Sequence, residues 1–511
     1  MIKIMRVQSY FNRNSLPVIL QCVNRIHNRT LSTTSEQPKP FSAIPGLGPL
    51  PIIGGLHHFL PVIGKIGSSE TFADLTKKLH KEFGTIVRLE GIFPKADMVM
   101  LYDPEHFDQI FRAEEIMPLR YGLGTITHYR EVLRKETFEG VYGLLSAQGP
   151  EWRDFRTKVN PALLKPKLVK LYAPGLDEIA REMVAKIIKL KDVNNYLQNN
   201  FDSEMTKFSL ESIALVCLGT RLGCLKDNLP GDHPAAQLIK CVTDSVDLSF
   251  KYELMPNFLQ KYNTRMFNRV MKLFDTQWDI SAMFIAQAKQ RIKERGHDIP
   301  EEDKSVIEKL LAIDEKVAVV MANEMLMAGI DTVAFATTAL LYRLALNPKV
   351  QDKLREEIQS HNTNRRYLKA CLKESLRMNT VVSGNLRRTT REHFVGGYVI
   401  PKGVDIVAAN DYLSMLDKYY PKASEFIPER WLADKNDPLY YGNTHPMVMQ
   451  PFGFGIRSCI GRRLAELEIE IFVERMISEL KVSWEGPPIK IVTRILNTFK
   501  KPYYFKFEPI K

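Results

Sequence analysis

The chain has 511 residues, of which 45% are hydrophobic and 25% are charged, and its formal net charge is +12. This apolar content is ample for a large core, and the absence of any low-complexity tract or internal repeat excludes a repeat protein and a low-complexity chain. The basic charge alone would allow a nucleic-acid partner, but no aromatic and basic recognition motif accompanies it, so we expect no nucleic-acid binding.

The amino terminus predicts a targeting segment. Residues 1–35 contain no acidic residue, and their basic residues are Lys3, Arg6, Arg13, Arg25 and Arg29. Such a basic leader, followed by serine and threonine, is typical of a mitochondrial transit peptide, which we place at residues 1–31, with the folded domain at 32–511. A disordered basic tail is the alternative. The longest apolar runs of the leader, such as residues 16–20, are too short to span a bilayer. Six cysteines without C-x-x-C or zinc spacing favour free thiols in a reducing compartment.

The first part of the domain reads as a stiff entry followed by a mixed region. Residues 44–51 (IPGLGPLP) interrupt any helix or strand repeatedly. Residues 69–83 have a helical pattern, and residues 85–89 and 97–102 read as a pair of strands. Glycines alternate with aromatic residues over 119–145, which suits either an adaptable apolar pocket wall or an ordinary surface loop. We expect helices within 178–225 and 258–295, separated by an irregular segment at 229–256.

Two helical motifs could serve a bound cofactor. Trp152 and Arg156 are four residues apart and share a helix face, so both can donate to one anion, although a packed tryptophan beside a solvated arginine has the same spacing. Residues 308–347 read as one long helix ending before a proline. It contains Gly329, whose missing side chain leaves room beside a flat cofactor, followed by Asp331 and Thr332 as an acid and a hydroxyl able to pass protons inward. Local bonding of these two side chains to the backbone is the alternative.

A glycine-rich loop near the carboxyl end holds the chemistry. The run P-F-G-F-G-I-R-S-C-I-G-R-R occupies residues 451–463, and its glycines allow the main chain to turn tightly beneath a planar group. Arg457 offers a forked cation to a carboxylate. Cys459 offers a thiolate, the ligand that pushes electron density towards a haem iron.

Phe452, Gly455, Arg457, Cys459 and Gly461 resemble the F-x-x-G-x-R-x-C-x-G signature of the cytochrome P450 superfamily. The resemblance covers nearly the whole chain and implies a mainly α fold with a small β region, with haem b between the long distal helix and the cysteine-loop helix. It implies Cys459 as the iron ligand. Trp152, Arg156 and Arg388 would bind the haem propionates, with Arg387 as an alternative to its neighbour.

The resemblance also assigns a structural network and an electron entrance. Glu374 and Arg377 match E-x-x-R, and Arg430 matches P-E-R, so the three would form a buried ion-pair network. Lys369, Lys373, Arg462 and Arg463 would form a basic patch that docks an acidic ferredoxin, unless they are simply solvated. Two departures stand out: Val333 occupies a position where a second hydroxyl is frequent, and the segment at 355–369 is shorter than usual.

The implied function is that of a mitochondrial P450 of the insect type. We expect a haem-thiolate monooxygenase, on the matrix side and peripheral to the inner membrane, that receives NADPH electrons through ferredoxin reductase and ferredoxin. Its substrate would be apolar, with residues 381–385 and 495–499 in the pocket wall, and its role would be xenobiotic detoxification. The alternatives are an ecdysteroid or steroid hydroxylase, an O2-independent haem-thiolate isomerase, and a non-catalytic haem sensor.

Overall fold

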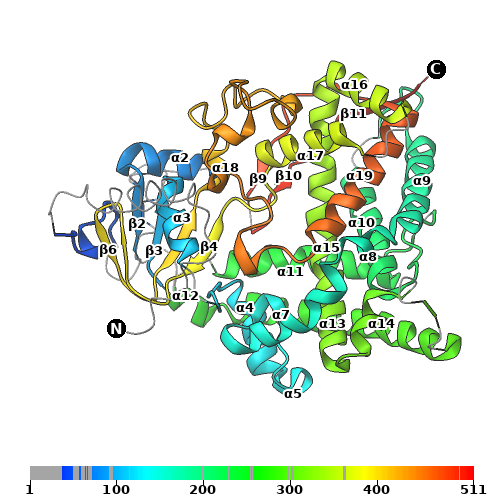
Figure 1. Cartoon of the computed structure of the whole chain (residues 1–511). Coiled ribbons are helices and arrows are strands. Elements are labelled where there is room, and N and C mark those ends of the chain that lie inside the picture. Colours follow the sequence, from blue (N-terminus) through cyan, green and yellow to red (C-terminus); the bar gives the residue numbers. More distant parts are fainter. Residues whose placement is uncertain are drawn as a thin grey trace, which may run out of the picture.

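The computed structural model describes residues 37–49, 57–58, 64, 66, 72–90, 96–113, 116–197, 201–227, 229–253, 255, 257–296, 299–300, 304–360, 364–493 and 495–510. The predicted leader and the last two residues of the proline-rich entry lie outside these ranges. A helical region and a smaller sheet region lie side by side, each with its own apolar core (Figure 1). The expected mainly α fold with a small β region is therefore confirmed.

Helices form most of the described chain. The longer ones are α2 (Phe72–Phe83), α3 (Pro104–Arg112), α7 (Gly149–Leu163), α9 (Ala173–Leu190), α10 (Phe201–Leu218), α11 (Pro234–Glu253), α13 (Thr264–Arg295), α15 (Glu315–Leu346), α16 (Pro348–Gln359), α17 (Arg366–Met378) and α19 (Arg462–Glu479). The shorter ones are α4 (Gly124–His128), α5 (Lys135–Phe138), α6 (Gly143–Ser146), α8 (Pro166–Lys170), α12 (Asn257–Tyr262), α14 (Val306–Leu311) and α18 (Asn410–Leu413).

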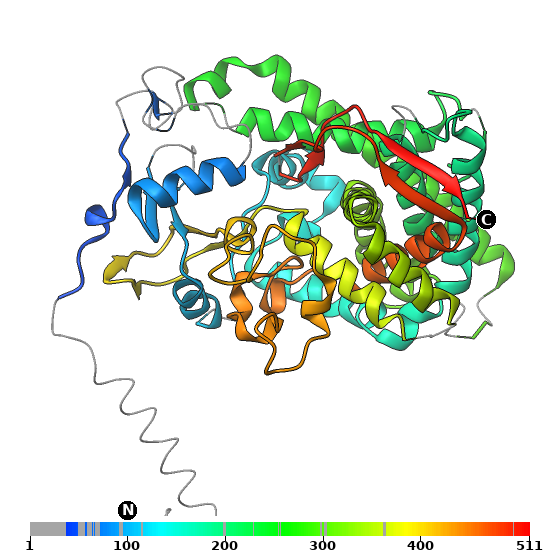
Figure 2. The ribbon, with the colours of Figure 1, turned by 90° about the horizontal axis from the view of Figure 1, so that it is seen from above.

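The central helix, α15, organises the helical region. Figure 2 looks along its axis and shows other helices and the β8–β11 pair around it. Its length and apolar composition would allow it to cross a membrane, but 72% of its most apolar window is buried inside the protein, as expected of a core helix. The predicted single helix over 308–347 is wrong at its start, because α14 ends at Leu311 and α15 begins anew. Asp314 causes this restart, since its carboxylate caps α15 by accepting from the Val317 N–H at 3.0 Å.

The main sheet has the strand order β1-β2-β3-β7-β4. Its strands are β1 (Gly46–Leu47), β2 (Ile86–Leu89), β3 (Met98–Leu101), β7 (Asp405–Ala408) and β4 (Asn385–Arg388). The predicted strand pair is confirmed as antiparallel β2 and β3, with Ile86 opposite Leu101. Two-stranded sheets are formed by β5 (His393–Val395) with β6 (Tyr398–Ile400), β8 (Leu480–Trp484) with β11 (Phe505–Pro509), and β9 (Ile491–Val492) with β10 (Thr498–Phe499).

Two segments are more helical than the sequence predicted. The expected irregular segment at 229–256 contains α11, whose buried stripe includes the small residues Ala235, Ser245 and Ser249. Small polar residues on a buried face give a weak apolar signal, which explains the error. The segment at 119–145 is also not one open loop, because α4, a π-helical turn (Tyr129–Leu133), α5 and the start of α6 succeed one another there.

Candidate active site

The cysteine loop enters α19 through a tight, glycine-dependent turn. Gly453 and Gly455 have φ angles of 74° and 65°, a backbone region that side chains disfavour. The Cys459 N–H donates to the Phe452 carbonyl at 2.8 Å, which closes the loop on itself. Gly461 differs from the expectation, because its φ is −86° and a Cβ placed there would meet nothing within 4 Å. Glycine at this position therefore leaves open space beside the cysteine.

We infer from two observations that Cys459 faces a recess within the protein. Its side chain is exposed, yet burial by the surrounding protein raises the pKa of the thiol. The exposure of the side chain and its burial by surrounding protein are both explained if the sulfur lines an internal space. The Gly461 N–H and the charges of Arg156 and Arg120 act against burial and favour the thiolate.

Buried arginines surround this recess, and several of their hydrogen bonds go to neutral carbonyl and amide oxygens. Arg156 donates to the Ser458 carbonyl at 3.0 Å and keeps a buried Nε without a partner, and burial lowers its pKa to about 10. Arg457 donates to the Pro118 carbonyl at 2.9 Å and to Gln148 Oε1 at 2.8 Å. A neutral acceptor does not compensate the charge of a buried cation, so this cluster suits a bound anion.

Arg120 belongs to the same cluster, although the sequence did not point to it. Burial and the charge of Arg387 lower its pKa, while Cys459 and Glu324 act in the opposite direction. Its guanidinium makes no hydrogen bond or ion pair within the described part of the chain. Its backbone is held by Gln148, whose amide donates to the Arg120 carbonyl at 2.8 Å. The charge of Arg120 therefore interacts with both Cys459 of the cysteine loop and Glu324 of α15.

Arg387 and Arg388 point to opposite sides of β4, as neighbours on a strand must. Arg388 forms a two-point ion pair with Asp405, at 2.8 and 2.7 Å, and lies over the Tyr121 ring. Arg387 is buried and donates to the Phe454 carbonyl at 2.8 Å, inside the cysteine loop. The geometry therefore disfavours the expectation for Arg388 and supports the alternative, Arg387.

Trp152 and Arg156 lie as the spacing on α7 predicted. The Trp152 ring packs against the Arg457 guanidinium, with 3.8 Å between the guanidinium carbon and the ring centroid. Arg156 is buried rather than solvated, so the alternative of a surface arginine is wrong. The two residues thus support the arginine cluster from one helix face.

Together these observations fit haem b, the cofactor that the family resemblance implies. The Cys459 thiol lines the recess, Gly461 leaves room beside it because it has no side chain, and arginines from four separate segments converge there. Haem carries two propionates, which are the anions that such a cluster would neutralise.

The middle of α15 opens onto unfilled space. Ala328 is exposed and its neighbours Gly329, Asp331 and Thr332 are half-buried, whereas the helix on either side is buried. The Thr332 hydroxyl donates to the Ala328 carbonyl at 2.7 Å, so the local bonding that we considered as an alternative is present for this residue. Asp331 instead reaches another helix, where it accepts a hydrogen bond from Thr243.

Gly329 also has a packing role that the sequence did not predict. A Cβ at this position would lie 2.8 Å from Cγ1 of Ile213 on α10, a helix that packs along α15. Glycine is therefore required by close helix packing, while the exposed Ala328 is a second small residue at the open part of α15.

The segment at 119–145 is pinned to α15 by a buried ion pair. Arg130 Nη1 lies 2.5 Å from Glu324 Oε1, and both side chains are nearly inaccessible to solvent. Glu324 also accepts from the Leu144 N–H at 2.8 Å. These contacts favour the pocket-wall interpretation over an ordinary surface loop.

The predicted ion-pair network comes together as expected. Glu374 accepts from Arg377 at 2.9 and 2.8 Å and from Arg430 at 2.9 Å, and all three side chains have zero exposure. Trp431 Nε1 and the Ile427 N–H also donate to the same carboxylate, at 2.9 and 3.1 Å. This network joins α17 to the segment that precedes the cysteine loop.

The predicted basic patch is only partly free. Lys369 and Lys373 are exposed on α17, which contacts α19. Arg462 is paired with Glu466 at 3.0 Å, and Arg463 donates to the Leu164 carbonyl. Three residues in the shortened segment before Lys369, 361–363, lie outside the described residues.

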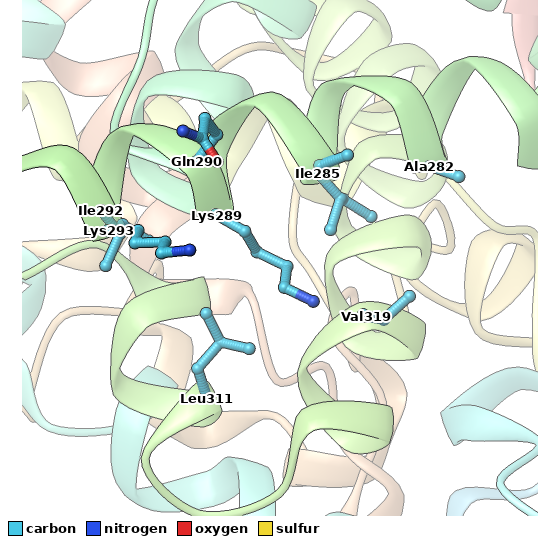
Figure 3. A pocket seen from close by; sticks show the side chains of 9 residues that line it. Ala282, Ile285, Lys289, Gln290, Ile292, Lys293, Leu311 and Val319 are labelled. Atoms are coloured by element: carbon cyan, nitrogen blue, oxygen red, sulfur yellow. The ribbon is translucent and has the colours of Figure 1, made fainter.

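A surface groove elsewhere is not the substrate site. It has a volume of about 560 Å3 and lies between α13, α14 and α15, with Leu311 and Val319 among its walls (Figure 3). Lys289 reaches across it and pairs with Glu315. None of the residues predicted for cofactor, proton or partner contacts lines this groove.

Comparison with known proteins agrees with this geometry. The family model described as "Cytochrome P450" matches residues 45–507. "Cytochrome P450 CYP12A2" of Musca domestica is 37% identical, covering 96% of this chain and 95% of the relative. "Probable cytochrome P450 12b2, mitochondrial" of Drosophila melanogaster is 35% identical, covering 98% and 96%. "Probable cytochrome P450 49a1" of the same fly is 32% identical, covering 93% and 84%.

Proposed function

This chain belongs to the cytochrome P450 family, and from that premise we propose that it is a mitochondrial monooxygenase that oxidises apolar foreign compounds. The reaction balances as RH + O2 + two electrons + two protons → ROH + H2O. The observation that carries the proposal is the convergence of buried arginines on the Cys459 loop. An acid–hydroxyl pair, Asp331 and Thr332, lies on the solvent-accessible part of α15.

The chain's own residues would hold haem b through two kinds of contact. Cys459 would ligate the iron, and Arg120, Arg156, Arg387 and Arg457 would neutralise the propionates. When bound, a thiolate-ligated haem supplies the capacity to cleave the O–O bond of O2. Phe452 and Gly461 shape the loop beneath it, while Trp152 keeps Arg457 in place by packing against its guanidinium.

Proton delivery would depend on Asp331 and Thr332. The Thr332 hydroxyl donates to the Ala328 carbonyl, which leaves its oxygen lone pairs able to accept a hydrogen bond from a water molecule and so to position it. Asp331, one residue earlier, would pass a proton to that water, because its side chain is only half-buried. Val333 offers no second hydroxyl, so the route would rest on this pair and on water.

Electrons would arrive at the face beside the cysteine loop. Lys369 and Lys373 are exposed on α17. Further exposed lysines lie in α8, which contacts α19, and directly before it, namely Lys165, Lys167 and Lys170. Such a patch suits an acidic ferredoxin supplied by its NADPH-dependent reductase. Relatives named as mitochondrial support a mitochondrial location, which we place on the matrix side and peripheral to the inner membrane.

The two segments expected in the pocket wall lie next to each other. The Asn497 N–H donates to the Val381 carbonyl at 2.9 Å, and its side-chain amide donates to the Thr380 carbonyl at 2.8 Å. Phe499 stacks on Phe335 of α15 with 4.5 Å between ring centroids. This apolar wall beside α15 supports an apolar substrate.

The test is product analysis by mass spectrometry with purified ferredoxin, its reductase and NADPH. We expect several foreign compounds to be hydroxylated, and Cys459→Ser to abolish turnover. A single hydroxylated steroid would replace the detoxification role with a biosynthetic one. Rearranged products without NADPH consumption would instead indicate an isomerase, and haem binding without any product would indicate a sensor.

A further inference from the structure

The acid of α15 is held by a residue that no sequence motif identifies. Thr243 of α11 places its hydroxyl oxygen 3.1 Å from one oxygen of the Asp331 carboxylate and 3.2 Å from the other. The two residues are 88 positions apart, and α11 runs across α15 (Figure 1). The contact therefore comes from tertiary packing alone.

This hydrogen bond acts on the direction of the carboxylate. The Thr243 hydroxyl is the donor, and the Asp331 oxygens accept. A hydroxyl within reach of both oxygens holds the carboxylate turned towards α11. We propose that Thr243 is a positioning residue, which keeps the Asp331 carboxylate oriented for proton delivery to Thr332. This inference rests on the proposed monooxygenase function.

Helix α11 also connects the Thr243–Asp331 contact to the segment at 119–145. At the carboxyl end of α11, Glu253 accepts hydrogen bonds from the Thr125 N–H and hydroxyl, at 2.7 and 3.1 Å. Thr125 belongs to α4, in the segment that Arg130 and Glu324 pin to α15. Asp331 is thus oriented by a helix that is also bonded to the expected pocket wall, so a substrate that displaces this wall would change proton delivery.

Failure of proton delivery can be measured from the products of the reaction. Hydroxylation requires the second proton to reach the oxygen atom that leaves as water. When delivery fails, the same two electrons and two protons reduce O2 to H2O2 instead. The ratio of hydroxylated product to NADPH consumed therefore reports how well Asp331 is positioned, whereas haem content and substrate affinity do not.

The experiment compares Thr243→Val, which keeps the side-chain shape, with Thr243→Ser, which keeps the hydroxyl. We expect Thr243→Val to lower the product-to-NADPH ratio roughly tenfold, at the low end of the effect of a general acid, with a matching rise in H2O2. Thr243→Ser should restore the ratio. Thr276→Val is the matched control, since Thr276 is half-buried on α13 and its hydroxyl donates to the Lys272 carbonyl of its own helix.

A double-mutant cycle in urea tests the contact without turnover. Thr243→Val and Asp331→Asn should be coupled by about tenfold in the unfolding equilibrium constant, as expected of a hydrogen bond to a charged group. If the two substitutions are coupled but the wild-type protein forms no product, the contact between Thr243 and Asp331 is supported and the monooxygenase proposal is contradicted. An active wild type with an unchanged product ratio in Thr243→Val, or no restoration by Thr243→Ser, would overturn the positioning role.

Discussion

Replacing Glu374 by glutamine tests the ion-pair network most directly, because glutamine keeps the volume of the side chain and removes its charge. The carboxylate accepts two hydrogen bonds from Arg377, one from Arg430, one from Trp431 and one from the Ile427 backbone. With the charge gone, two guanidinium groups of zero exposure lose their counter-ion. Breaking a buried ion pair in this way costs about 3–5 kcal/mol.

That loss is a large part of a typical stability of about 5–15 kcal/mol, so we expect Glu374→Gln to release haem. The measurements are urea unfolding followed by circular dichroism and the reduced carbon-monoxide difference spectrum. Glu466→Gln is the control, because Glu466 is partly exposed and its pair with Arg462 should contribute less than about 1 kcal/mol. A Glu374→Gln protein with a normal spectrum and stability within about 1 kcal/mol of the wild type would refute the reasoning.

Three further predictions follow from individual contacts. Arg387→Leu should lower the haem-to-protein ratio after gel filtration, whereas Arg388→Leu, which breaks only the Asp405 pair, should not; the reverse order would restore the original assignment. Gly329→Ala should destabilise the fold by about 1–3 kcal/mol in urea, because its Cβ meets Ile213. The double variant Gly329→Ala/Ile213→Ala should lose less stability than the sum of the losses in the two single variants. Additive losses would contradict the packing of Gly329 against Ile213. Burial raises the pKa of Asp411 from 3.8 to about 7. The folded state therefore holds an extra proton between these values, and stability should fall as the pH rises through this window; Asp411→Asn should remove the fall, and an unchanged slope would contradict it.

The sequence alone was sufficient for those parts of the site whose chemistry is local. The cysteine, its flanking glycines and Arg457 lie within ten residues, so their spacing defines a loop under a planar cofactor. Glu374 and Arg377 are one helical turn apart, and the Pro-Glu-Arg run supplied Arg430. A strongly apolar 32-residue helix was also visible in outline, although the cap at Asp314 hid its start.

Only the tertiary structure decided which of two neighbouring arginines faces the cysteine loop, because strand pleat and pairing with Asp405 turn Arg388 away. It also showed that Gly329 serves the contact with α10, and that Arg120 and Thr243 reach the site from elements with no motif of their own. Motifs record spacing along one segment. A contact between segments 88 residues apart depends on how two helices cross, and a single sequence does not specify that crossing.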